Sequence, residues 1–432
     1  GDSLKTIGDW AFDGCNSLNT VNVSKLDVFF NDYSFAHEGN PFSKASTLHV
    51  NGKEVTELVI PDGVEELNEG FFYNFGKNVT SVTIPNSVKN IGYDTFRDWT
   101  NLSQVTLGDS LETIGTAAFQ GCTALESIII PNSVISFARD VFSNCSNLAS
   151  VTLSNSLKTI GGGSFRECTR LDSIIIPNSV TTIEDRVFEG CTKLSYITLG
   201  DSLKTIGDWA FDGCNSLNTV NVSKLDVFFN DYSFAHEGNP FSKASTLHVN
   251  GKEVTELVIP DGVEELNEGF FYNFGKNVTS VTIPNSVTKI GGSAFKNWTN
   301  LAQVTFGESL KAIGDWAFAG CSALTRIDLP NSLESIGGYA FNVCSNLSYI
   351  TLGDSLKTIG DWAFDGCNSL NTVNVSKLDV FFNDYSFAHE GNPFSKASTL
   401  HVNGKEVTEL VIPDGVEELN EGFFYNFGKN VT

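Results

Sequence analysis

Residues 111–134 read LETIGTAAFQGCTALESIIIPNSV, and the fold follows from the spacing inside this stretch. Its apolar positions return with the same spacing more than 200 residues later. The two matching sets are Leu111, Ile114, Phe119, Cys122, Leu125, Ile128 and Ile130, and Leu333, Ile336, Phe341, Cys344, Leu347, Ile350 and Leu352. The phenylalanine recurs every 23 residues in two series, Phe96, Phe119, Phe142, Phe165, Phe188, Phe211 and Phe234, then Phe295, Phe318, Phe341, Phe364 and Phe387. So short a period admits one supersecondary turn per repeat.

Each repeat is predicted to form one turn of a solenoid. The pattern Leu-x-x-Ile-x-Ile alternates inward and outward positions, which indicates a brief strand. Pro-Asn-Ser or Gly-Asp-Ser then supplies a turn, and Ile-Gly marks a second bend before the phenylalanine. One unit cannot bury its own apolar side, so the units must stack with their strands parallel. We therefore expect a single continuous repeat solenoid over residues 1–432, with a parallel β-sheet on its concave face and little helix.

Three long identical copies are superimposed on the short period. Residues 1–88 recur at 200–287, and residues 1–80 recur at 353–432. The offsets of 199 and 153 differ by 46, which is two repeats, so duplication by whole turns preserves the stacking register. Each copy carries an insertion, near 36–61, 235–260 and 388–413, and its Asn-Gly pair between alternating apolar runs predicts a β-hairpin. The repeat pattern is degenerate around Phe35, Phe234 and Phe387.

The composition is that of a folded, acidic protein. The 432 residues include 27 basic and 51 acidic side chains, for a net charge of −24, and 41% are hydrophobic, too many for a disordered chain. The acidic excess argues against binding to nucleic acid or to an anionic membrane, because both need clustered Lys and Arg. No apolar run approaches the roughly 18–20 residues of a membrane helix. The sequence contains no Met, so we expect it to be a processed or excised portion of a longer protein.

The cysteines and histidines suggest no catalytic or metal site. All nine cysteines occupy the same repeat position, which favours a ladder of buried free thiols over required disulfides. Without any Cys-x-x-Cys, a zinc site is not expected. The six histidines are three copies of two, and no Gly-x-Ser-x-Gly or comparable setting provides a nucleophile. Glu38 beside His37 gives only a weak metal motif, and the acidic run from Asp62 to Glu69 lacks the Asp/Asn alternation of a calcium loop.

Outward strand positions are where a solenoid presents a binding face. One outward column is mostly threonine, which the propensity for strands explains by itself. The neighbouring column holds Tyr196, Arg326 and Tyr349. Tyr and Arg are typical anchors of protein interfaces, so we predict that these three residues contribute to binding.

A second aromatic column lies two residues before the repeat phenylalanine: Trp10, Trp209, Trp316, Tyr339 and Trp362. Other repeats place Ala117, Asp94, Arg186 or Ser293 there, which indicates an exposed position. Trp316, Tyr339 and Trp362 fall in three successive repeats and are further candidate binding residues. They either form an aromatic strip that meets protein or sugar, or cover one another.

The motif Ile-Pro-Asn-Ser-Val-x-x-Ile-Gly-x-x-x-Phe-x-x-Cys-x-x-Leu resembles the BspA-like class of leucine-rich repeats over nearly the whole chain. In Trp99 and Trp298, tryptophan takes the Cys position. The resemblance implies a leucine-rich repeat solenoid from a surface or secreted protein of bacteria or of some mucosal protists. It also implies adhesion to extracellular-matrix proteins or to other cells, and implies no catalysis.

The functional hypothesis is a non-enzymatic surface or secreted binding protein that adheres through multivalent contacts along a rigid rod. Its expected partner is an extracellular-matrix or cell-surface protein, or a glycan, with no cofactor, metal, nucleic acid or membrane insertion. The alternative is a structural spacer or self-assembling rod without a dedicated ligand, which stacks end to end.

Overall fold

The computed structural model describes residues 7, 10–26, 45–69, 72, 76–225, 240–269, 271, 275–377, 393–412, 414, 416 and 431. The degenerate repeats at Phe35, Phe234 and Phe387 lie outside the described residues, as do His37, Glu38, His236, His389 and parts of the three insertions. The chain divides into unit 1, residues 1–223 and 236–243, and unit 2, residues 224–235 and 244–432.

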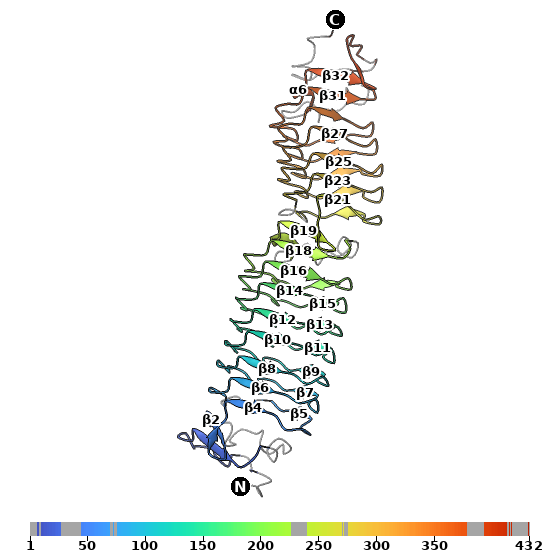
Figure 1. Cartoon of the computed structure of the whole chain (residues 1–432). Coiled ribbons are helices and arrows are strands. Elements are labelled where there is room, and N and C mark those ends of the chain that lie inside the picture. Colours follow the sequence, from blue (N-terminus) through green and yellow to red (C-terminus); the bar gives the residue numbers. More distant parts are fainter. Residues whose placement is uncertain are drawn as a thin grey trace. The chain divides into compact units, whose positions relative to one another are not determined.

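Each unit is a parallel β-solenoid, and the predicted fold class is confirmed. Figure 1 shows the strands of each unit lying side by side from one turn of the chain to the next. In unit 1 the longer strands are β4 (Glu57–Val59), β6 (Ser81–Thr83), β8 (Gln104–Thr106), β10 (Ser127–Ile129), β12 (Ser150–Thr152), β14 (Ser173–Ile175), β16 (Tyr196–Leu199) and β18 (Thr219–Val222). In unit 2 they are β21 (Glu256–Val258), β23 (Ser280–Thr282), β25 (Gln303–Thr305), β27 (Arg326–Asp328), β29 (Tyr349–Thr351) and β31 (Thr372–Val375). The paired neighbours in these two columns are all parallel. Residues paired across two strands are 23 or 24 positions apart in the sequence, so the pairing follows the repeat period.

A second parallel sheet, absent from the sequence-based prediction, runs through each unit. It is built from two-residue strands that end at the isoleucine of Ile-Gly or its equivalent. In unit 1 these are β5 (Glu66–Leu67), β7 (Asn90–Ile91), β9 (Thr113–Ile114), β11 (Ser136–Phe137), β13 (Thr159–Ile160), β15 (Thr182–Ile183) and β17 (Thr205–Ile206), and in unit 2 β22 (Glu265–Leu266), β24 (Lys289–Ile290), β26 (Ala312–Ile313), β28 (Ser335–Ile336) and β30 (Thr358–Ile359). The glycine that follows is needed because a Cβ on Gly115 would lie 2.7 Å from the backbone of Gly92 in the preceding turn.

The long copies add antiparallel pairs at the Asn-Gly positions. Strands β1 (Thr20–Val23) and β2 (Thr47–Val50) pair in parallel, and β2 then pairs antiparallel with β3 (Lys53–Glu54). The same antiparallel arrangement joins β19 (Thr246–Val249) to β20 (Lys252–Glu253), and β32 (Thr399–Val402) to β33 (Lys405–Glu406). Asn51 has φ of 50° and Gly52 of 78°, as this hairpin turn requires. Two one-turn helices, α4 (Pro240–Lys243) and α6 (Pro393–Lys396), are the helical elements of the described residues.

The core of each unit is a ladder of stacked phenylalanine rings. From Phe72 to Phe211 in unit 1, successive rings are nearly parallel, with centroids 5.1–5.8 Å apart. The same ladder runs from Phe271 to Phe364 in unit 2. These rings are almost fully buried, so the ladder supplies hydrophobic burial and aromatic stacking in every turn.

The cysteine column lies beside this ladder and has a hydrogen-bonding role. The nine thiols are free, and all except Cys15 are buried. Each buried Sγ donates to the carbonyl oxygen of a phenylalanine in the preceding turn, as from Cys168 to Phe142 at 3.2 Å. Trp99 and Trp298 occupy the same position, and their Nε1 groups donate to Phe72 and Phe271 at 3.1 Å. The column therefore satisfies a buried carbonyl, which explains why tryptophan replaces cysteine there.

Candidate binding surfaces

The outward positions of the longer strands form the broadest candidate surface. In unit 1, from Ser81 to Thr198, every outward residue is uncharged. Ile129 and Ile175 project from this surface and are 71% and 67% exposed. An uncharged face of β-branched and hydroxyl side chains is notable in a chain of net charge −24, because most of its surface repels other acidic molecules.

The corresponding face of unit 2 carries a compact charged and aromatic group, here called the sheet-face cluster: Arg326, Asp328, Tyr349 and Thr351. Arg326 and Asp328 lie two residues apart on β27 and share a face. The Arg326 Nε is 2.6 Å from Asp328 Oδ2 and its Nη2 is 2.8 Å from Oδ1, a bidentate pair. The guanidinium carbon of Arg326 lies 4.2 Å from the ring centroid of Tyr349, its parallel neighbour on β29. Stacking and pairing therefore hold the guanidinium in one orientation.

The carboxylate of Asp328 is the centre of this cluster. Thr351 Oγ1 donates to Asp328 Oδ1 at 2.7 Å. Burial raises the pKa of the Asp328 carboxyl, but the hydrogen bonds from Arg326 and Thr351 and the charge of Arg326 outweigh it, so the pKa is lowered. The cluster is therefore fixed and ionised before any partner arrives.

The hairpin of the third copy borders the cluster. The ring centroid of His401 on β32 lies 6.2 Å from that of Tyr349, nearly edge-on. Asn374 Oδ1 accepts a hydrogen bond from the Gly404 amide at 2.8 Å, and Asn403 Nδ2 donates to Ser376 O at 2.9 Å. These bonds tie the Asn-Gly turn to the adjacent repeat, so the hairpin places His401 at a defined position next to Tyr349.

Tyr196 occupies in unit 1 the position that Tyr349 has in unit 2, but its strand neighbours differ. It is half-buried on β16, and its parallel neighbour on β14 is Ser173. Thr198 in turn lies beside Ile175, where unit 2 has Asp328. The sheet-face cluster therefore occurs in unit 2, whereas the equivalent Tyr196 of unit 1 has uncharged strand neighbours.

The aromatic column, defined as Trp10, Trp209, Trp316, Tyr339 and Trp362, has an unusual backbone. All five residues adopt φ between 55° and 61°. This left-handed conformation costs a non-glycine residue about 1–2 kcal/mol. Gly163 stands at the equivalent position in another turn, with φ of 67°. The aromatic side chains are therefore kept at positions where the backbone favours glycine.

Only part of the predicted strip stacks. The rings of Trp316 and Tyr339 are 4.2 Å apart and 5° from parallel, and Lys296 Nζ lies 4.5 Å from the Trp316 centroid. Within the described part of the chain, Trp362 has no ring contact with Tyr339. Among the six predicted binding residues are two contacting pairs, Arg326 with Tyr349 and Trp316 with Tyr339, and Tyr196 and Trp362 belong to neither pair. Their role in binding stays a prediction.

Sequence reasoning did not select Asp328, His401 or Lys296 as binding residues. Residues two apart on a strand share a face, so the sequence already predicts that Asp328 lies on the same face as Arg326. The contact of His401 depends on how the predicted hairpin packs beside Tyr349, and that of Lys296 depends on the left-handed turn, and the sequence pattern reveals neither.

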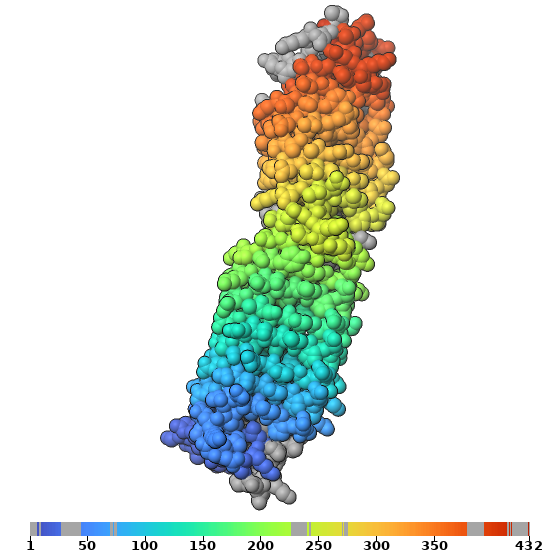
Figure 2. All heavy atoms as spheres, viewed as in Figure 1, coloured from blue at the N-terminus to red at the C-terminus, as the bar shows by residue number. Residues whose placement is uncertain are grey.

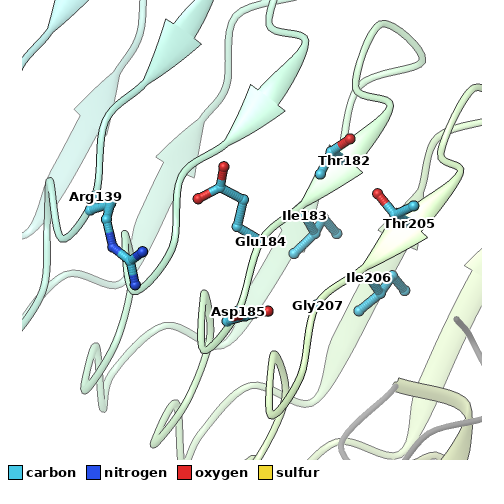
Figure 3. Close-up of a pocket in the computed structure, with 8 residues that line it drawn as sticks. All are labelled: Arg139, Thr182, Ile183, Glu184, Asp185, Thr205, Ile206 and Gly207. Carbon is cyan, nitrogen blue, oxygen red and sulfur yellow. The ribbon is translucent and has the colours of Figure 1, made fainter.

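A shallow polar depression of about 360 Å³ lies along the short-strand sheet of unit 1. Figure 3 shows Arg139 two turns before Glu184 and Asp185, with Thr182 on the turn of the two acids and Thr205 on the next turn. Glu184 Oε2 accepts from the Gly162 amide at 2.8 Å and Asp185 Oδ1 from the Asp208 amide at 3.0 Å. Both carboxylates therefore brace neighbouring turns.

The described residues contain no group of three or more His, Cys, Asp or Glu side chains arranged to hold a metal ion. Nor do they include a helix with the length and apolar character needed to span a membrane. Figure 2 shows the described residues of each unit as successive bands of atoms in sequence order.

Comparison with known proteins gives a family match. The model for the BspA type leucine rich repeat region matches residues 1–43, 46–171, 158–240 and 264–392. Comparison with curated proteins gives no match.

Several solved structures are also similar to the chain. A leucine-rich repeat protein from Bacteroides ovatus is 26% identical, with 74% of this chain and 86% of that chain covered and a TM-score of 0.47. A leucine rich cell surface protein from Faecalibacterium prausnitzii is 28% identical, with coverage of 74% and 88% and a TM-score of 0.39. A leucine rich repeat protein from T. pallidum is 36% identical, with coverage of 38% and 78% and a TM-score of 0.35.

Proposed function

The chain belongs to the BspA-type leucine-rich repeat family, and from that membership we propose a non-catalytic surface or secreted protein that adheres to matrix proteins or to other cells. Repeat solenoids of this kind serve as scaffolds for protein interaction, with side chains displayed in columns on a rigid sheet. The proposed location at the cell surface rests on the resemblance of its repeats to those of surface and secreted proteins.

The sheet-face cluster is the observation that carries the proposal. Residues that dominate protein interfaces are enriched in Tyr and Arg, and they bind best when they are held in position before contact. Arg326 is fixed by Asp328 and by the ring of Tyr349. Little side-chain entropy is therefore lost when a partner covers it.

Multivalency follows from the repeats. The outward columns present similar threonine and isoleucine side chains in successive turns, and Tyr196 and Tyr349 stand at equivalent positions in two places along the chain. Several weak contacts made by one chain raise the effective concentration at each further contact. The uncharged face of unit 1 would add contact area, and the cluster of unit 2 would add specificity.

The test is binding of the full 432-residue chain to a panel of immobilised extracellular-matrix proteins and glycans. The variants are Tyr349→Ala and Arg326→Ala, with Tyr196→Ala as the matched control. For the ligand that binds, we expect Tyr349→Ala to weaken binding by about tenfold or more, the loss typical of a hot-spot residue. The control should stay within about threefold, because Tyr196 would supply one weak contact beside a strand neighbour, Ser173, that carries no charge.

Two results would overturn this function. Binding that is unchanged in both unit 2 variants would remove the cluster from the interface. An absence of binding across the panel at physiological salt would favour the alternative of a spacer or self-assembling rod. Light scattering against protein concentration then identifies self-assembly, because it requires no partner.

A further inference from the structure

The long copies place one tryptophan in the same sequence, Gly-Asp-Trp-Ala-Phe-Asp-Gly, at Trp209 and at Trp362. Both residues have the left-handed backbone, with φ of 55° and 60°, and both are exposed, 49% and 38%. Because the local sequence is identical, any difference between the two sites comes from the neighbouring turns.

At Trp209 the chain supplies its own cation. The guanidinium carbon of Arg186, in the preceding turn, lies 5.0 Å from the centre of the Trp209 ring system. The backbone amide of Arg186 donates to Asp208 O at 3.0 Å, which fixes the two turns relative to each other. The electron-rich face of this indole is therefore occupied by a positive charge.

At Trp362 the equivalent residue is Tyr339, which supplies no cation. Its backbone amide donates to Asp361 O at 2.9 Å, so the two turns are joined as at Trp209. The ring of Tyr339, however, stacks on Trp316, 4.2 Å away. Across the residues that the structure describes, no ring and no cation lies against Trp362. The indole that contacts Arg186 in unit 1 therefore has no cation of the described residues against it in unit 2, where it is still 38% exposed.

The surrounding charge favours a cation. Asp361 precedes Trp362 and is exposed, while Asp365 lies 3.5 Å from Lys396. A negative field raises the local concentration of basic groups near the open indole.

We propose that Trp362 is a docking site for a lysine or arginine side chain from a basic segment of a partner protein. The partner's cation takes the place that Arg186 takes on Trp209. The site shares no residue with the sheet-face cluster and does not rest on the proposed function.

The experiment follows each tryptophan separately by fluorine NMR of the full chain labelled with 5-fluorotryptophan. The probe is N-acetyl-arginine amide at millimolar concentrations, and N-acetyl-citrulline amide serves as the uncharged control of the same shape. Resonances are assigned by replacing each tryptophan with phenylalanine. We expect arginine amide to shift the Trp362 resonance in a saturable manner, to shift Trp209 much less, and citrulline amide to shift neither.

Two reciprocal variants extend the test. Tyr339→Arg gives Trp362 an internal cation and should abolish its response, whereas Arg186→Tyr uncovers Trp209 and should create one. Each introduces a side chain that the other turn already carries with the same backbone conformation. Equal shifts of Trp209 and Trp362 in the unmodified chain, or equal effects of arginine and citrulline amides, would overturn the proposal, as would an Arg186→Tyr chain in which Trp209 stays unresponsive.

Discussion

Replacement of Phe165 by alanine tests the physical basis of the solenoid most severely. Phe165 is fully buried, and the rings of Phe142 and Phe188 stack on it from the two adjacent turns, each with a centroid 5.6 Å away. Phe137 contacts it edge-on at 6.2 Å. Truncation of a buried phenylalanine costs about 3–5 kcal/mol, and each lost ring pair about 0.5–1.5 kcal/mol beyond burial. The measured cost of truncation already includes the lost ring contacts, so the loss of two stacked partners and one edge-on partner places the expected value in the upper part of that range, about 4–5 kcal/mol.

In a solenoid this loss should be local, because each turn contacts only its neighbours. Hydrogen exchange followed by mass spectrometry measures the opening free energy of separate turns. We expect it to fall in the turns around residues 142–188 and to stay constant in unit 2. The control is Ile129→Ala on the exposed sheet face, with an expected change within about 0.5 kcal/mol. A Phe165→Ala loss below about 1 kcal/mol, or an equal loss throughout the chain, would refute the ladder as the source of stability.

Three further predictions concern strained and buried groups. Val343 is a β-branched residue with φ of 59°, so Val343→Gly should raise the free energy of unfolding by up to about 1 kcal/mol. The urea midpoint should rise accordingly, and a lower midpoint would show that no strain is relieved. A thiol reagent should modify Cys15 alone in the native chain and all nine cysteines after denaturation, and rapid native labelling of a second cysteine would contradict the buried ladder. Burial raises the pKa of Cys145 to about 12 from an ordinary 9.0, so the unfolded chain loses this proton first and stability should fall as pH rises between those values. The slope of urea midpoint against pH should become shallower in Cys145→Ala, and an unchanged slope would argue against a buried neutral thiol.

Most of the fold could be predicted from the sequence because every turn repeats the same pattern of apolar and turn-forming residues. The period fixed the stacking register, and the Phe and Cys positions marked the core. The second sheet was missed since its strands, such as Thr113–Ile114, are two residues long and cannot display an alternating pattern. The role of Trp99 could be identified only in the structure, where its indole nitrogen donates the hydrogen bond that a cysteine thiol donates in other turns.

The candidate sites were predictable only in part. Tyr349 and Arg326 were recognised as interface residue types on outward positions, and the structure adds Asp328 and His401 as the residues that hold or flank them. The residue type of Trp362 does not predict its left-handed backbone conformation. The sequence indicates that conformation only through Gly163, which stands at the equivalent position of another repeat.

The central claim is that the sheet-face cluster of unit 2 provides specific binding, and transfer of that cluster tests it most directly. Arg326→Ser with Asp328→Ile gives unit 2 the side chains of Ser173 and Ile175, and Ser173→Arg with Ile175→Asp gives unit 1 the cluster. The measurement is the affinity of these two full-length variants for the panel ligand that the unmodified chain binds. We expect the first variant to lose about tenfold or more in affinity and the second to gain through a second site. Equal affinity of both variants and the unmodified chain would contradict the claim.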